Sequence, residues 1–140
     1  MAGARLDRRW GFIDRTGAFV IGPSYEQLRH FSEGLACVKK DSKWGMIDFD
    51  GRTVIDFRFD DLEPLGAGLA AARIETTSGF ISRSGEWAID PEFERCYSFF
   101  GKLAVVKRGE TYSYIRRDGK IVWSSSPGAA IQYPPRPLFV

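Results

Sequence analysis

Short apolar runs alternate with turn-forming residues along most of this chain. In the second quarter, apolar runs cover residues 35–38, 44–47 and 54–55, and the pairs Asp41-Ser42 and Asp50-Gly51 separate them. Runs of this length between such pairs are typical of β-strands. Glycine after aspartate supplies the positive φ that a tight turn needs. The pattern therefore predicts a three-stranded antiparallel meander.

The same pattern returns at a constant offset of 34 positions. Its central stretch reads Trp-Gly-Phe-Ile-Asp at 10–14, Trp-Gly-Met-Ile-Asp at 44–48, Ser-Gly-Phe-Ile-Ser at 78–82 and Tyr-Ser-Tyr-Ile-Arg at 112–116. A fixed period of this length is the mark of a repeat architecture. We predict an all-β fold of four tandem 34-residue repeats, arranged as an open arc, a solenoid or a propeller-like stack.

The connector between meanders has a different pattern. In residues 23–34 the apolar residues Tyr25, Leu28 and Phe31 are spaced by three, which predicts one helical or 3₁₀-like turn. A period of 34 also occurs in tetratricopeptide helix pairs, but the Asp-Gly turns and β-branched runs favour strands. We place the repeat domain at residues 1–123 and a Pro-rich extended tail at 124–140.

Glycine recurs inside the middle strand, at Gly11, Gly45 and Gly79. Glycine weakens a strand and often marks a place where another group comes close. We expect an aromatic ring or the backbone of a neighbouring repeat over these positions.

These motifs resemble a known family. The chain combines tandem Trp-Gly-aromatic-Ile-Asp stretches, a glycine three residues later, an Ile-x-Pro-x-aromatic-acid connector and the return Ser-Glu-Gly-Leu-Ala at 32–36. This combination resembles the bacterial WG repeat family, also called KWG after starts such as Lys43-Trp44-Gly45, and the resemblance covers residues 1–123. It implies a β-repeat scaffold regarded mainly as an interaction module, with no catalytic residues to carry across.

Composition narrows the classes of partner. Twenty basic and eighteen acidic residues give a net charge of +2, so neither nucleic acid nor a membrane surface is the expected partner. No apolar run is long enough for a membrane span, and the first residues lack the apolar core of a secretion signal. We therefore expect a cytoplasmic protein. Cys37 aligns with Ala71 and Cys96 with Leu28, so both cysteines are predicted to be reduced packing residues.

Candidate catalytic chemistry is sparse. His30 is the one histidine, and two cysteines at apolar repeat positions do not form a zinc-binding pattern. We find no nucleotide-binding glycine motif and expect no cofactor and no metal. Glu26, Asp60 and Glu94 recur in register, which fits a structural role in the connector but also leaves paired carboxylate catalysis open. We expect that the protein is not an enzyme.

Two sets of residues are candidates for partner binding. Arg5, Lys39, Arg73 and Lys107 occupy equivalent positions, and Lys40 and Arg108 extend this basic row. The row fits either an acidic partner surface or solvated charges that discourage edge pairing between strands. Arg95 and Tyr97 differ from their equivalents in other repeats, which fits either a partner contact or burial in the connector.

The leading functional hypothesis is a non-enzymatic protein-protein interaction module, such as an adaptor or a small inhibitor of the immunity type. The alternative is a glycan or small-ligand binder, which predicts solvent-facing rings among Trp10, Trp44, Trp87 and Tyr112. A carboxylate-based hydrolase is the third interpretation. The expected partner is another protein, and an open repeat array would also allow a homodimer.

Overall fold

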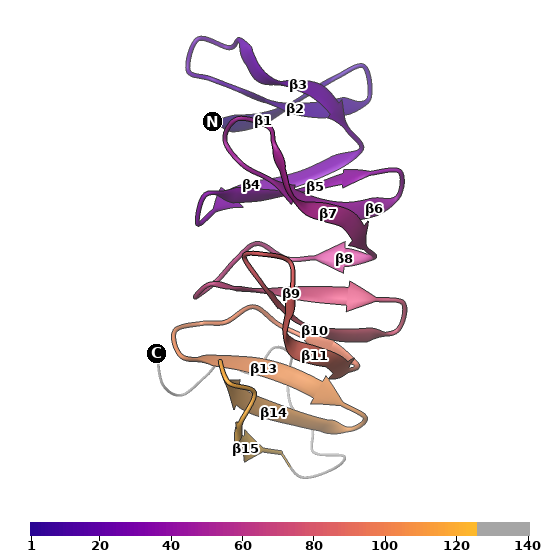
Figure 1. Ribbon diagram of the computed structural model, residues 1–140, viewed down its shortest axis with the longest axis vertical. Helices are drawn as coiled ribbons and strands as arrows, with labels where there is room; N and C mark the ends of the chain where they lie inside the picture. The colour runs from indigo at the N-terminus through magenta and orange to yellow at the C-terminus, as the bar shows by residue number, and fades with distance from the viewer. Residues whose placement is uncertain (126–140) are drawn as a thin grey trace. The chain divides into compact units, whose positions relative to one another are not determined.

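The computed structural model describes residues 1–125 and divides the chain into two compact units, Met1–Pro64 and Leu65–Val140. The prediction of an all-β fold built from tandem repeats is confirmed, because the described residues form strands and turns without a helix (Figure 1). No helix suited to crossing a membrane therefore occurs among them. Most of the predicted tail, residues 126–140, lies outside the described part of the chain.

Unit 1 holds the first two repeats. Its strands are β1 (Ala2–Leu6), β2 (Arg9–Ile13), β3 (Phe19–Tyr25), β4 (Gln27–Ser32), β5 (Leu35–Lys40), β6 (Lys43–Ile47), β7 (Thr53–Phe59) and β8 (Asp61–Leu62). Strands β1, β2 and β3 form one antiparallel sheet, and β4, β5, β6 and β7 form a second, each in sequence order.

Unit 2 holds the last two repeats. Its strands are β9 (Leu69–Ile74), β10 (Thr77–Ser82), β11 (Trp87–Phe93), β12 (Arg95–Cys96), β13 (Leu103–Arg108), β14 (Thr111–Arg116) and β15 (Ile121–Ser124). Strands β9, β10 and β11 pair as an antiparallel meander, and β12, β13, β14 and β15 form the last sheet.

An aspartate closes the turn between the second and third strands of the early repeats. In repeat 2, the Asp48 carboxylate accepts hydrogen bonds from the backbone N–H groups of Asp50 and Arg52, both at 2.9 Å. Gly51 completes this turn at φ 82°, a conformation that residues with a side chain rarely adopt. The recurrent Asp-x-x-Gly spacing therefore reflects a demand of the turn.

The core of each unit lies between two consecutive repeats. In unit 1, Phe12 and Ile21 of repeat 1 pack against Ala36, Val38 and Ile47 of repeat 2. In unit 2 the same arrangement recurs between repeats 3 and 4. Its buried members are Leu69, Ala71, Phe80, Ile89, Phe93, Phe99, Ala104, Val106 and Ile115. Within each unit, the first repeat thus buries one face against the second repeat.

The connector corrects the prediction of a helical or 3₁₀-like turn. Residues Gln27–Ser32 form strand β4, which pairs with β5 and shifts register between Leu28 and Phe31. In repeat 4, the shorter strand β12 pairs with β13 in the same way. The spacing of three reflects a bulged strand. Side chains normally alternate between the two faces of a strand, and the extra residue of a bulge places residues three apart on the same face.

The middle-strand glycines also need a correction. A Cβ at Gly45 would lie 2.4 Å from the Ile55 carbonyl oxygen, and Gly11 and Gly79 have the same relation to Ile21 and Ile89. The predicted close approach is confirmed, but the approaching group is the backbone of the third strand in the same repeat. Strand pairing shifts register at each of these places, which brings the two backbones together.

Cys37 is expected to be chemically inert in the folded protein. Its side chain is fully buried and forms no disulfide, and burial raises the pKa of its thiol to about 12. At about pH 9, where an ordinary thiol is largely ionised, native Cys37 should resist alkylation that proceeds readily in denaturant. Because the folded-state pKa is raised, the free energy of unfolding should fall as the pH rises from about 8.5 towards that value. Peptide mass mapping measures the alkylation of Cys37. Rapid labelling of the native protein would contradict the prediction that Cys37 is inert.

Candidate functional site

In unit 1, the predicted cations stand at the same point of their hairpins. Arg5 pairs across the strands with Trp10, and its guanidinium lies 6.0 Å from the centre of that ring. Lys39 pairs with Trp44 in the same register, and Lys40 is exposed. The structure therefore places these residues at equivalent positions, as the repeat predicts.

In unit 2, the remaining cations are held by contacts with other residues of the same unit. The Arg73 guanidinium donates to the Glu75 carbonyl oxygen at 2.5 Å. Lys107 forms an ion pair of 3.0 Å with Glu94, and this hydrogen bond raises the pKa of Lys107. Arg108 lies 3.7 Å from the Glu92 carboxylate and packs over the Phe93 ring. These contacts give three members of the basic row a structural role; whether the row forms one line across all four repeats stays a prediction.

Arg95 and Tyr97 come together beside Lys107. Arg95 pairs with Lys107 between β12 and β13, and the backbone N–H of Tyr97 donates to the Val105 carbonyl at 3.0 Å. Hydrogen bonding with Tyr97 raises the pKa of Arg95. Arg95 is exposed, whereas the Tyr97 ring is partly buried against Val105 and its neighbours. The burial alternative thus applies to the Tyr97 ring, and a partner contact at Arg95 stays a prediction.

The recurrent acids each contact a hairpin next to their connector; for Glu26 and Glu94 it is the hairpin that follows, and for Asp60 it is the hairpin that precedes. Glu26 accepts from the backbone N–H of Ser42, Asp60 pairs with Lys43, and Glu94 pairs with Lys107. These contacts support the structural interpretation of the three acids. In the part of the chain that the structure describes, no group of three or more His, Cys, Asp or Glu side chains is placed to hold a metal ion.

The predicted aromatic residues are largely covered. Trp44 is 4 % exposed, and the Arg29 guanidinium lies 4.3 Å from its ring centre. Trp10, Trp87 and Tyr112 are partly buried. The exposed tryptophan is instead Trp123, which was not among the predicted residues.

Trp123 belongs to an apolar surface that we call the end face. It is the face of the β12–β15 sheet that carries Leu103, Val105 and Tyr114, with Tyr97 and Tyr112 packed against them. Leu103, Val105 and Tyr114 are buried, at 6 %, 4 % and 8 % exposed, so Trp123 is the exposed part of this face. The opposite face of this sheet, with Ala104, Val106 and Ile115, packs on repeat 3. In the repeat order, the end face occupies the position that a following repeat covers in repeats 1 and 3.

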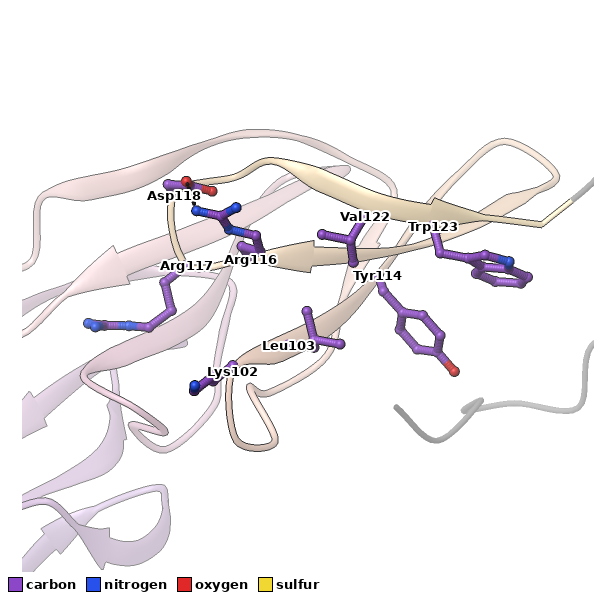
Figure 2. Close-up of a pocket in the computed structure, with 8 residues that line it drawn as sticks. All are labelled: Lys102, Leu103, Tyr114, Arg116, Arg117, Asp118, Val122 and Trp123. Atoms are coloured by element: carbon purple, nitrogen blue, oxygen red, sulfur yellow. Dashed lines mark hydrogen bonds and ion pairs between the residues drawn. The ribbon is translucent and has the colours of Figure 1, made fainter. Parts of the chain in front are cut away.

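A pocket of about 770 Å³ opens on the end face. Its lining consists of Lys102, Leu103, Tyr114, Arg116, Arg117, Asp118, Val122 and Trp123. Figure 2 shows the two rings at one end of the pocket and the charged side chains at the other, with Leu103 and Val122 between them. The rings of Tyr114 and Trp123 lie 5.3 Å apart between centres at 36°. The pocket thus combines an apolar floor with a cationic rim.

Repeat 4 departs from the other repeats at this pocket. Trp123 stands where Ile21, Ile55 and Ile89 stand, and it is 47 % exposed, whereas those residues are 6 %, 1 % and 7 % exposed. Isoleucine in the other repeats is a core residue. The change to a large, partly exposed ring therefore marks a surface that differs in chemistry from the internal interfaces.

The turn beside the pocket has also changed. Arg116 occupies the position of Asp14 and Asp48, whose carboxylates accept backbone hydrogen bonds in the turn. In repeat 4 this task passes to Asp118, which accepts from the backbone N–H of Lys120 at 2.9 Å and forms a 3.0 Å ion pair with Arg116. The bond from Lys120 is the main cause that lowers the pKa of Asp118. The turn therefore keeps its geometry while presenting an added cation.

A family model for the WG containing repeat matches residues 10–44, 44–75 and 79–112. The chain belongs to the WG repeat family. This match covers most of the chain and agrees with the resemblance in the sequence motifs. The WG repeat fold suggests a repeat-based binding module.

A solved structure shares the fold of these WG repeats. It is described as "KlHsv2 with loop 6CD replaced by a Gly-Ser linker", with a TM-score of 0.50 and 14 % sequence identity. The similarity covers 72 % of this chain and 38 % of that chain, so the WG repeats span well under half of that protein. At this identity the likeness concerns the fold alone. No curated protein matches the chain.

The predicted partner-binding residues and the pocket share a sheet in repeat 4. Arg95, Tyr97 and Lys107 lie on β12, the segment after it and β13, next to the strands that carry Tyr114 and Trp123. Sequence reasoning missed Lys102 and Trp123 although a signal was present. Lys102 replaces Gly34 and Gly68 of earlier WG repeats, and Trp123 replaces an isoleucine. Comparison of the last repeat with the others, position by position, identifies both.

Proposed function

We propose that this WG repeat protein is a non-enzymatic protein-binding module that holds its partner on the end face of repeat 4. The observation that carries the proposal is the 47 % exposure of Trp123 at a position that is otherwise core. Tryptophan and tyrosine rings are frequent anchors of protein interfaces because they bury a large area at small conformational cost. An adaptor or a small inhibitor would both use such a face.

The surroundings of Trp123 support this choice of surface. Leu103 and Tyr114 form an apolar floor beside the exposed ring, and charged side chains surround it. An apolar centre with a polar rim is the usual anatomy of an interface between proteins. Arg95 and Lys107 extend the same sheet with charged groups.

The test is affinity capture from a lysate of the source organism, with the tagged chain compared with two variants. The end-face variant carries Val122→Ser and Trp123→Ser. The control carries Val54→Ser, since Val54 is the equivalent of Val122 in repeat 2 and is exposed to a similar extent, 42 % against 50 %. We expect one stoichiometric protein with the natural chain and the control, and at least about tenfold less with the end-face variant.

A second arm addresses the predicted basic row. It replaces Arg5, Lys39, Arg73 and Lys107 by serine and leaves Trp123 in place. Retention of the partner by the end-face variant, together with its loss from the row variant, would move the binding surface to the row. Equal capture by all forms would contradict both surfaces.

The ring pair of Tyr114 and Trp123 also favours a second candidate, a glycan or small-ligand binder. Two rings 5.3 Å apart at the end of a pocket form a platform on which a sugar ring or a planar ligand can stack. A glycan array probed with the natural chain and with Trp123→Ser tests it. Saccharide binding that depends on Trp123, with no protein captured, would favour this candidate.

A further inference from the structure

We propose that the outer edge of strand β1 binds an extended, acidic segment of another protein as an added strand. This surface lies in repeat 1 and does not depend on the end face of repeat 4. The inference rests on the equivalent edges in repeats 2 and 4, where a connector strand occupies the place beside the first strand of the hairpin.

The outer edge of β1 has no strand beside it in the described part of the chain. In repeat 2, the equivalent strand β5 pairs with β6 on one side and with β4 on the other. In repeat 4, β13 likewise lies between β12 and β14. Within residues 1–125, β1 pairs with β2 alone, and every residue of β1 except the half-buried Ala4 is exposed. An open edge can receive a further strand through its backbone hydrogen-bonding groups.

The connectors identify a backbone acceptor on this edge. The Glu26 N–H donates to the Lys39 carbonyl oxygen at 2.8 Å, and the Glu94 N–H donates to the Lys107 carbonyl oxygen at 2.8 Å. Arg5 occupies the position of Lys39 and Lys107. The Arg5 carbonyl oxygen is therefore the acceptor for the backbone of an added strand.

The same connector residues supply a carboxylate to the hairpin. The Glu94 carboxylate forms a 3.0 Å ion pair with Lys107, and the Glu26 carboxylate accepts from the backbone N–H of Ser42 at 3.2 Å. An acidic residue thus serves both the cation on the strand and the turn that follows it. An occupant of the β1 edge needs an acid at this point.

The hairpin of repeat 1 offers the same two groups to an acid. Arg5 is the equivalent of Lys107, and Arg8 is the equivalent of Ser42. Asp7 and Arg8 have φ angles of 51° and 70°, and the equivalent pair in repeat 2 has 51° and 67°. The backbone of the turn is therefore the same. Arg5 and Arg8 are exposed and form no ion pair within residues 1–125, so their charges favour a partner of opposite sign.

An apolar residue two positions after the acid completes the pattern. Leu28 pairs with Val38 between β4 and β5, and Cys96 pairs with Val106 between β12 and β13. Ala4 occupies the position of Val38 and Val106. An apolar side chain of the added strand would lie opposite Ala4 and form the cross-strand contact that stabilises such pairs.

These requirements favour a different protein over this chain itself. Residues 126–140 contain no acidic residue. Leu28, which follows Glu26 at the required spacing, already belongs to β4 and pairs with β5. A second copy that paired edge to edge would bring Arg5 and Arg8 close to the same cations of the first copy, and like charges oppose such pairing.

The experiment measures fluorescence polarisation of a rhodamine-labelled peptide with the sequence of residues 24–33, which carries Glu26 and Leu28 in the required spacing. A second peptide carries Glu26→Lys, a third carries Leu28→Ser, and a fourth is methylated at the backbone nitrogen of Glu26. The proteins are the full chain, the variant Arg5→Glu and the control Arg15→Glu. The control changes an exposed arginine in a turn of the same repeat and has the same net charge as the variant.

The first peptide should bind the natural chain and the control equally, and Arg5→Glu at least about fivefold more weakly, as for loss of a good exposed ion pair. The Glu26→Lys peptide should reverse this order. The methylated peptide should bind the natural chain at least about fivefold more weakly because it lacks the backbone donor. The Leu28→Ser peptide should bind about threefold more weakly because it lacks the cross-strand contact.

Equal binding of the methylated and unmethylated peptides would overturn the inference, as would failure of Glu26→Lys to restore binding to Arg5→Glu. Failure of the first peptide to bind the natural chain would also overturn it. The variant Trp123→Ser should bind the peptide as the natural chain does. A negative result here therefore leaves capture on the end face as a separate question.

Hydrogen exchange identifies the strand that the peptide joins. The peptide should slow exchange in residues 2–6 and leave residues 35–40 unchanged. Slower exchange confined to residues 35–40 would mean that the peptide replaces β4 beside β5, which would overturn the inference. A dimer in sedimentation that the peptide dissociates would assign the β1 edge to a second copy and overturn it as well.

Discussion

Replacement of Gly45 by alanine should lower the free energy of unfolding by about 3 kcal/mol, at the upper end of the range for overpacking. The added Cβ would lie 2.4 Å from the Ile55 carbonyl oxygen and 3.0 Å from the Asp56 carbonyl carbon. Both atoms belong to the backbone of β7, so relief requires a shift of the strand rather than of a side chain. Chemical denaturation followed by circular dichroism measures the loss.

Gly22→Ala is the matched control for this prediction. Gly22 lies in β3, no atom lies within 4 Å of a Cβ built there, and its equivalents are Asp56 and Asp90. The control should leave stability unchanged or raise it by about 0.5 kcal/mol, because alanine restricts the unfolded chain. A loss at Gly45→Ala as small as that of the control would show that β6 and β7 separate easily, contrary to the close approach described here.

Replacement of Phe80 by alanine should cost about 3–5 kcal/mol, as is usual for a phenylalanine removed from a core. Phe80 is fully buried between repeats 3 and 4, and its ring meets that of Phe99 at 4.9 Å. The loss combines the buried area of the ring with the cavity that remains between two sheets. The same denaturation measurement applies, and it reports on the core of unit 2.

Two further variants give this prediction its controls. Phe80→Met introduces the residue that repeat 2 has at the equivalent position, Met46, and should cost less than about 1.5 kcal/mol. Phe100→Ala removes a ring that is 56 % exposed and should change stability by no more than about 0.5 kcal/mol. If Phe80→Ala and Phe100→Ala had similar effects, the buried interface between repeats 3 and 4 would not be the main source of stability in unit 2.

The two large effects concern different parts of the repeat. Gly45 is needed because two backbones of one repeat approach each other, whereas Phe80 is needed because the next repeat covers it. The end face is the case in which this second requirement is altered. There the ring position is Tyr114, and the buried isoleucine has become the exposed Trp123.

Local chemistry explains what could be predicted from the sequence. The meander strands, the turns and the repeat boundaries all follow from residues close together in the chain, such as Asp48 and Gly51, whose roles recur every 34 positions. The close approach at Gly11, Gly45 and Gly79 could be expected because glycine recurs there inside a strand. The approaching group could not, because the bulge that brings β7 over Gly45 depends on pairing between strands.

The connector shows where sequence reasoning was misled. A spacing of three between Leu28 and Phe31 is shared by a helical turn and by a bulged strand, and only the hydrogen bonds of β4 to β5 distinguish them. Among the predicted binding residues, the positions of Arg95, Tyr97 and Lys107 on one sheet were likewise set by strand pairing. Their ion pairs and packing come from neighbours that no sequence motif connects.

The all-β repeat, the turns and the residues of the core could be predicted from the sequence, because they depend on local backbone preferences and on the alternation of apolar side chains. Which face of a repeat is covered, and by which residues, depends instead on packing between sheets. The same apolar positions recur in every repeat, so their pattern does not show which of them another sheet covers. In repeat 4, Ala104, Val106 and Ile115 lie against repeat 3, whereas Trp123 is 47 % exposed at a position that is core in the other repeats, because packing between sheets sets the exposure of each side chain.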